Sequence, residues 1–233
     1  MLQVSGLHSH YGRAHILADV SLSVARGEVV VLLGRNGAGK STTIKSIMGL
    51  VAPSAGERHF QGHSLAGLAP HAIARLGLGY VPEERRVFAD LTVAENLEVG
   101  RQPPRQGCPH WSPERLYELF PNLRELRHRP GGRTSGGEQQ MLSIARTLMG
   151  NPALILLDEP SEGLAPVIVQ QLAGTINALK QQGLAVLLSE QNLQFATRVS
   201  DRAYIIEKGR IRYQGSMAEL AADESVRTAY LSV

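Results

Sequence analysis

Residues 34–41 read Gly-Arg-Asn-Gly-Ala-Gly-Lys-Ser and match a glycine-rich phosphate-binding loop at every defined position. Glycines let backbone N–H groups turn toward phosphate oxygens, and a helix that starts here adds the positive end of its dipole. In such a loop Lys40 reaches the β- and γ-phosphates of a nucleotide, and Ser41 ligates Mg²⁺. The sequence therefore predicts an ATP site with these contact residues: Gly34, Arg35, Asn36, Gly37, Ala38, Gly39, Lys40, Ser41 and Thr42.

Two carboxylates, Asp158 and Glu159, follow the apolar run 154–157. If this run is a strand of a parallel sheet, it delivers both side chains to the carboxyl edge, where ligands of α/β proteins bind. We expect Asp158 to hold Mg²⁺ through water, and Glu159 to polarise the water that attacks the γ-phosphate. Two carboxylates at a strand end are common by themselves, but beside a phosphate loop they indicate hydrolysis.

Residues 134–140, Thr-Ser-Gly-Gly-Glu-Gln-Gln, begin an amphipathic helix with a Ser-Gly-Gly turn. Such a turn offers free N–H groups and a dipole end to a phosphate. It cannot hold the same phosphates as the loop around Lys40, because that loop already fills the role. The segment is therefore either an ordinary capped helix start or an anion site that completes the nucleotide site of another subunit.

Hydrophobic patterning predicts the elements that position these residues. Val29–Leu33 is a continuous apolar run, typical of a strand buried on both faces. Residues 38–50 have helical spacing. From residue 154 onward strands and helices alternate, which predicts a parallel sheet. The expected strands there are 154–157, 185–188 and 203–207, and the expected helices are 165–181, 193–199 and 216–222.

Other parts of the chain have a different character. Residues 1–33 alternate apolar and polar positions and predict strands, whereas residues 51–82 look turn-rich with one short strand at 77–81. Residues 90–150 predict helices and a proline-rich loop at 102–113. We expect one domain, 1–233. Its core comprises about 1–89 and 151–233, and a helical lobe at about 90–150 carries residues 134–138.

Bulk properties exclude several classes. A net charge of +3 on 233 residues gives no reason to expect nucleic-acid binding. Seven arginines between Arg101 and Arg133 form either a solvated basic surface or a face toward anionic lipid headgroups. The single cysteine, Cys108, fits a reducing compartment. The first residues do not resemble a signal peptide, and no apolar run reaches the ~20 residues of a spanning helix. We expect a cytoplasmic protein that docks on other chains if it works at a membrane.

Over essentially its whole length the chain resembles the nucleotide-binding subunits of ATP-binding cassette (ABC) transporters. The motifs occur in the same order: Tyr11, 34–41, 79–83, 134–138, Asp158-Glu159, 161–166 and 189–191. The resemblance implies an α/β fold of the P-loop NTPase class. It also implies a mainly parallel core sheet, an N-terminal antiparallel β subdomain and an inserted helical lobe.

The resemblance assigns roles to further residues. It implies that Tyr11 stacks on adenine, although a lone tyrosine near a glycine can equally be turn packing. It places Glu83 as a ligand of nucleotide and Mg²⁺, and Gln191 beside the γ-phosphate. Residues 134–138, here called the signature segment, would contact the ATP of a second subunit through Ser135, Gly136, Gly137 and Glu138.

The resemblance also implies an assembly. Two ABC ATPase subunits, identical or different, pair head-to-tail with ATP between the phosphate loop of one and the signature segment of the other. They sit on two transmembrane permease subunits at the inner face of the cell membrane, and a solute-binding protein takes part indirectly. ATP closes the pair, hydrolysis opens it, and the helical lobes pass the motion to the permeases.

Within the family, four strings resemble the ATPases of branched-chain amino-acid and urea/amide importers: 80–86, 135–142, 159–166 and 190–192. The chain departs from the wider family pattern where Thr134 replaces leucine, Glu138 and Glu83 replace glutamine, and Gln191 replaces histidine. Gln191 can donate a hydrogen bond but cannot carry a proton. We expect active but slow hydrolysis, without a histidine-type pH dependence from this position.

Two other classes of protein compete with the importer ATPase. A soluble ABC ATPase acting on nucleic acid or ribosomes usually carries two cassettes or a long inserted arm, for which 233 residues leave no room. A nucleotide sensor that binds ATP without hydrolysing it would not need Glu159, the candidate general base. We therefore expect an ATPase that uses ATP and Mg²⁺, has permease partners and does not bind nucleic acid.

Overall fold

The computed structural model describes residues 1–231, and its centre is a six-stranded sheet in the order β10-β9-β3-β8-β7-β6. Five neighbouring strands run parallel, and only β10 is antiparallel to its neighbour. The strands are β3 (Val29–Leu33), β6 (Leu78–Val81), β7 (Leu154–Asp158), β8 (Ala185–Glu190), β9 (Arg202–Glu207) and β10 (Arg210–Ser216). Every residue of β3, β7 and β8 is buried, as their continuous apolar runs predict. The predicted mainly parallel sheet is confirmed.

A second, antiparallel sheet has the order β2-β1-β4-β5. Its strands are β1 (Leu2–Tyr11), β2 (Ala14–Val24), β4 (Pro53–Phe60) and β5 (His63–Ser64). The prediction that 51–82 is mostly turns was wrong for β4, whose sequence PSAGERHF lacks an apolar alternation. Pairing with β1 stabilises this strand. The guanidinium of Arg58 also holds it, donating to the carbonyls of Ser46, Ile47 and Leu65.

The two faces of the six-stranded sheet bury different layers. Val30 and Leu32 of β3 face the antiparallel sheet and α1 (Lys40–Ile47). Val29, Val31 and Leu33 face the opposite core, which includes α6 (Gly136–Leu148), α7 (Pro166–Gln181) and α8 (Leu193–Val199). Because successive strand residues point to opposite faces, one short apolar strand supports both cores.

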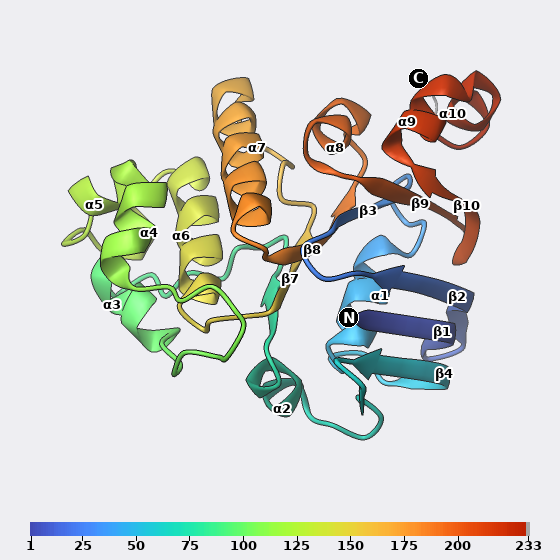
Figure 1. Cartoon of the computed structure of the whole chain (residues 1–233), viewed down its shortest axis with the longest axis horizontal. Helices are drawn as coiled ribbons and strands as arrows, with labels where there is room; N and C mark the ends of the chain where they lie inside the picture. Colours follow the sequence, from blue (N-terminus) through green and yellow to red (C-terminus); the bar gives the residue numbers. More distant parts are fainter. Residues whose placement is uncertain (232–233) are drawn as a thin grey trace.

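The helices of the middle of the chain lie together at one side of the sheet, next to α7 (Figure 1). They are α3 (Val93–Val99), α4 (Pro113–Leu119), α5 (Pro121–Glu125), the 3₁₀ turn η1 (Gly131–Arg133) and α6. Polar residues start three of them: Thr92 caps α3, Ser112 caps α4 and Ser135 caps α6. The proline-rich segment 102–112 has no helix or strand, as predicted.

Three further helices complete the described chain: α2 (Pro70–Arg75), α9 (Met217–Ala222) and α10 (Glu224–Leu231). Helix α9 starts at the capping box of Ser216 and Glu219, whereas α2, α5 and α10 were not predicted. These three are short, and α10 has no buried residue, so their sequences carry little periodic signal. Among residues 1–231, no helix combines the length and apolar character needed to cross a membrane.

Candidate nucleotide-binding site

The loop from β3 to α1 approaches its neighbours too closely for side chains at two positions. A Cβ on Gly34 would lie 2.5 Å from the carbonyl oxygen of Ile206. At Gly39 the backbone has a φ of 112°, and a Cβ would lie 2.9 Å from Leu17 Cδ2. The two glycines therefore let the loop wrap tightly before α1 begins at Lys40, which is the backbone geometry of a phosphate cradle.

Lys40 is buried, with 3% of its surface exposed, and lies at the centre of the site. Its Nζ donates to the carbonyl oxygens of Gly34 at 2.7 Å and Arg35 at 3.1 Å. The same atom lies 3.1 Å from Glu159 Oε1. The ammonium group therefore joins the phosphate loop to the strand end that carries Asp158 and Glu159.

Asp158 ends β7 and pairs in register with Ser189 of β8. Ser189 Oγ donates to Asp158 Oδ1 at 2.7 Å, and Tyr80 Oη donates to Oδ2 at 3.4 Å. Burial raises the pKa of Asp158, and hydrogen bonding by the hydroxyls of Ser189 and Ser41 counteracts this rise. Ser41 and Asp158, the two predicted Mg²⁺ ligands in the core, are thus brought together.

Glu159 leaves the strand in a left-handed backbone conformation, with φ of 45°. Its N–H donates to Ser189 Oγ at 3.0 Å and to the Ser189 carbonyl at 3.2 Å. A non-glycine residue in this region is strained unless its surroundings hold it, and such residues are often functional. Here the turn directs the carboxylate toward Lys40. Ser189 therefore holds the carboxylate of Asp158 and the backbone of Glu159, a role that the sequence motifs did not reveal.

Glu190 is a second buried group that sequence reasoning did not place in the site. Its carboxylate accepts hydrogen bonds from the backbone N–H groups of Ser161, Gln191 and Asn192 at 3.0 to 3.2 Å. Burial raises the pKa of Glu190, and these hydrogen bonds counteract the rise. Glu190 therefore ties the loop after Glu159 to the segment that carries Gln191. The sequence carried only a partial signal: an acidic residue at the end of a mostly apolar strand needs buried donors, but no local pattern identifies those donors.

The predicted residues outside this centre differ in their positions. Gln191 lines a cavity of about 530 Å³ together with Gly34, Arg35 and Asn36. The side chain of Glu83 is exposed to solvent and does not line this cavity. Partial burial raises the pKa of Glu83, and the nearby charges of Glu159 and Asp158 raise it further. Tyr11 is half exposed at the end of β1, where the chain turns into β2.

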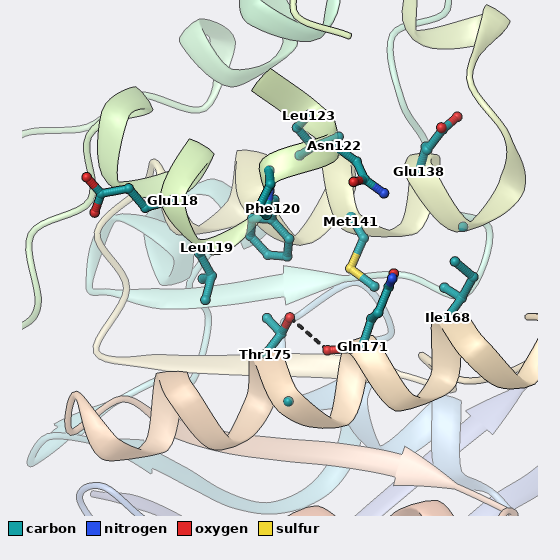
Figure 2. A pocket seen from close by; sticks show the side chains of 13 residues that line it. Glu118, Leu119, Phe120, Asn122, Leu123, Glu138, Met141, Ile168, Gln171 and Thr175 are labelled. Atoms are coloured by element: carbon teal, nitrogen blue, oxygen red, sulfur yellow. Dashed lines mark hydrogen bonds between the residues drawn. The ribbon is translucent and has the colours of Figure 1, made fainter. Parts of the chain in front are cut away.

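The signature segment starts α6 and is placed differently. Ser135 and Glu138 form a capping box, in which Ser135 N–H donates to Glu138 Oε2 at 2.6 Å. Gly137 and Glu138 line a separate cavity of about 430 Å³ between α6, α7 and the α4–α5 connection. Figure 2 shows Phe120, Met141 and Ile168 facing that space. The predicted signature residues therefore do not line the cavity beside the phosphate loop.

The donor set around Ser41 and Asp158 fits Mg²⁺. Magnesium prefers hard oxygen ligands and keeps several waters, so one hydroxyl, one carboxylate and nucleotide phosphates suffice. No group of three or more His, Cys, Asp or Glu side chains within the described residues is arranged to hold a metal ion by itself.

The parallel sheet, the glycine loop and the carboxylates at the ends of neighbouring strands define a P-loop NTPase. The family model described as "ABC transporter" matches residues 17–162. The chain therefore belongs to the ABC transporter family, as its resemblance predicted. Proteins of this family bind and hydrolyse ATP, and this chain is an ATPase of that class.

Relatives cover nearly the whole chain. It is 44% identical over 231 residues to a high-affinity branched-chain amino acid transport ATP-binding protein of Pseudomonas aeruginosa, covering 99% of each chain. It is 39% identical to a lipopolysaccharide export system ATP-binding protein of Acidithiobacillus ferridurans, covering 99% of this chain and 96% of the other. A solved ATP-binding cassette of an ABC transporter in its ADP conformation is 26% identical. It aligns with a TM-score of 0.84, covering 100% of this chain and 99% of the other. The predicted fold class is confirmed.

Proposed function

We propose that this chain hydrolyses Mg-ATP at the interface of two ABC subunits and thereby drives solute uptake through separate permease subunits. The observation that carries the proposal is the joining of Lys40, Asp158 and Glu159 at one sheet edge, while Ser135 begins a helix away from it. The proposed solute is a branched-chain amino acid or a related amino acid or amide, by similarity to the Pseudomonas relative. Urea or a short-chain amide is the alternative solute.

Phosphate binding is the task of the loop and Lys40. Backbone N–H groups of residues 34–41 and the α1 N-terminus provide partial positive charge, and Lys40 provides a full charge. Ser41 and Asp158 would hold Mg²⁺, with Glu83 as a further oxygen donor at the rim. The bound metal would neutralise charge that develops on the phosphates.

Hydrolysis needs a group that orients and deprotonates water. Glu159 is the residue that we propose for this role, and its strained turn and its ion pair with Lys40 support the proposal. Gln191, in the same cavity as the phosphate loop, can donate a hydrogen bond to the γ-phosphate or to the water. Because the side chain of Gln191 does not gain or lose a proton between pH 5 and 8, we expect the pH dependence of the reaction to come from the carboxylates.

Pairing of two subunits follows from the position of the signature segment. Ser135 and Gly136 are exposed at the start of α6, a thirteen-residue helix with free N–H groups. A nucleotide bound by a second subunit can supply the anion for this helix start. The two copies would then exchange the same pair of surfaces, as a two-fold dimer does.

The proposed contact with a permease is a groove of about 580 Å³ beside β6, α2, α3 and α6. Leu50, Phe88 and Val99 line it with 48%, 47% and 54% of their surfaces exposed. Among the described residues these are three of the five most exposed large apolar side chains, so the groove is a concentrated apolar surface. A cytoplasmic helix of a permease subunit is the occupant that we propose.

Pull-down tests this function and separates it from its alternatives. Tagged protein with Glu159→Gln, which should retain Mg-ATP, is incubated with detergent-solubilised native membranes, and all retained proteins are identified. We expect two permease-type proteins, with or without a second ATPase. Recovery of the membrane subunits of a lipopolysaccharide export system would show that the chain drives export rather than import, as the Acidithiobacillus relative does. Recovery of nucleic acid or ribosomes alone would remove the transport proposal.

A further inference from the structure

Two consecutive arginines in the loop after β6 adopt a conformation that side chains normally avoid. Arg85 has φ of 61° and Arg86 has φ of 47°. Helix α6 holds both residues: Ser143 Oγ donates to the Arg85 carbonyl at 2.7 Å, and Arg146 Nη2 donates to the Arg86 carbonyl at 2.8 Å. Strain of this kind persists only where surrounding contacts over-determine it, and it often marks a functional position.

The strained turn sets the guanidinium of Arg85 against the start of α6. A Cβ on Gly136 would lie 2.7 Å from Arg85 Nη1 and 3.5 Å from its Cζ. A Cβ on Gly163, in the loop after Glu159, would lie 4.0 Å from Nη2. The charged group therefore lies between the signature segment and the loop that follows the candidate general base.

This guanidinium makes no hydrogen bond or ion pair with any group of residues 1–231. The neighbouring Arg86, in contrast, forms an ion pair with Glu84 at 3.5 Å. Arg85 is half-buried, so some water has been removed from a charge without a protein partner to replace it. A planar guanidinium in this setting is well suited to a phosphate group.

Charge balance gives an independent reason for a cation here. Glu83 and Glu138 replace the glutamines of the usual family pattern, and Gln191 replaces a histidine that can be charged. The two glutamates make the surroundings of the nucleotide more negative, and Gln191 adds no positive charge. A triphosphate adds further negative charge when a second subunit supplies it, and the half-buried Arg85 is placed to offset that charge.

We propose that Arg85 binds the terminal phosphate of the nucleotide held by a second copy of this chain, alongside the N–H groups at the start of α6. The proposal rests on the head-to-tail pairing in the proposed function. It assigns to Arg85 a contact across the subunit interface, whereas Lys40 contacts the phosphates of its own subunit's nucleotide. Arginine is suited to this role because it can donate two parallel hydrogen bonds to phosphate oxygens.

The test measures ATP-driven pairing in a Glu159→Gln background by sedimentation velocity, together with binding of ATP to the monomer. We expect Arg85→Gln to weaken pairing about tenfold or more, because a hydrogen-bonded charge is lost. We expect the ATP affinity of the monomer to stay within about twofold. Arg85→Lys should restore part of the pairing, and Arg86→Gln should leave it unchanged.

Mixed pairs identify the subunit on which Arg85 acts. A Lys40→Ala copy is not expected to bind nucleotide. In a mixed pair with a Glu159→Gln copy it therefore contributes only its signature segment, which faces the ATP of the other copy. Pairing should weaken when Arg85→Gln is placed on that copy. Equal weakening from either copy, unchanged pairing of Arg85→Gln, or an equal loss with Arg86→Gln would overturn the role of Arg85. Failure of Glu159→Gln itself to pair with Mg-ATP would instead contradict pairing between two copies of this chain and remove the basis of the Arg85 proposal, while the proposed function would still stand with a different ABC subunit as the partner.

Discussion

The N-termini of helices α1 and α6, which we propose to contact phosphate groups, have different surroundings. At the start of α1, Lys40, Asp158 and Glu159 are each at least nine-tenths buried. Lys40 forms an ion pair with Glu159 and a hydrogen bond to Gly34, and Asp158 accepts a hydrogen bond from Ser189. At the start of α6, Ser135 and Gly136 are exposed, and the capping box uses local groups only.

The site at α1 is therefore preorganised for its ligand, whereas the site at α6 is incomplete within one chain. The first region has its charges fixed before a nucleotide arrives, because neighbouring strands of one sheet deliver them to a single edge. The second has donors and a nearby guanidinium, and the carboxylate that its own chain supplies there, Glu138, is used by the capping box. Changes in the first region should therefore affect stability, binding and catalysis in a monomer, while changes in the second should affect pairing.

The largest effect is expected from Lys40→Ala. Removal of the lysine leaves Glu159 buried without a partner and should lower the free energy of unfolding by about 3 kcal/mol. ATP binding should be lost as well. The matched control is Lys180→Ala, since Lys180 pairs with Asp201 near the surface, where an ion pair is worth less than about 1 kcal/mol. Denaturant unfolding measures both. Equal losses from the two substitutions would contradict the comparison.

Glu159→Gln should lower steady-state phosphate release by at least about 100-fold, because a general base is lost. ATP binding should be kept, since the phosphate loop and Lys40 remain. Glu98→Gln, on the exposed Glu98–Arg101 pair of the helical region, serves as the control and should leave the rate unchanged. A rate within threefold of wild type for Glu159→Gln would remove this residue from the mechanism.

Ser135→Ala sharpens the comparison at the second region. Loss of a capping hydroxyl should cost about 1 kcal/mol of stability. Ser216→Ala removes an equivalent capping box at the start of α9 and should cost a similar amount. Only Ser135→Ala should weaken ATP-driven pairing. If both variants weaken pairing equally, the effect reflects stability rather than contact with a nucleotide.

The smallest effect is a pH dependence at Glu162. Hydrogen bonding to the Glu159 carboxylate, followed by burial, raises the pKa of Glu162 to about 7. Because the folded-state pKa lies above the ordinary value, protonated Glu162 contributes stability below about pH 4.5. That contribution is lost as the pH rises through 7. Without nucleotide, wild type and Glu162→Gln should have similar unfolding free energies at pH 5, and wild type should be the less stable at pH 8. An equal difference at both values would contradict the raised pKa.

The strength of the local signal decided which elements the sequence revealed. Strands β3, β7 and β8 were predictable because each is a continuous apolar run buried on both faces. Helix α8 matched its predicted bounds. Strand β4 was missed because it is polar and depends for its hydrogen bonds on β1, a strand that lies more than 40 residues earlier in the chain.

The residues of the candidate site also differ in whether the sequence could identify them. The phosphate loop, Asp158 and Glu159 could be named from sequence because their chemistry needs fixed residue types at short spacing. The supporting groups Ser189, Glu190 and Tyr80 could not, because they act through contacts between strands that are distant in the chain.

The sequence by itself determined the class of chemistry, the alternation of strands and helices, and the residues predicted to bind phosphate, since these depend on local pattern. Only the tertiary structure decided that Lys40 meets Glu159, that Glu190 joins two loops and that the guanidinium of Arg85 lies on Gly136. Such contacts arise when the sheet sets the register of its strands and α6 fixes a strained turn. No short stretch of sequence encodes the distance between groups that the folded chain brings together.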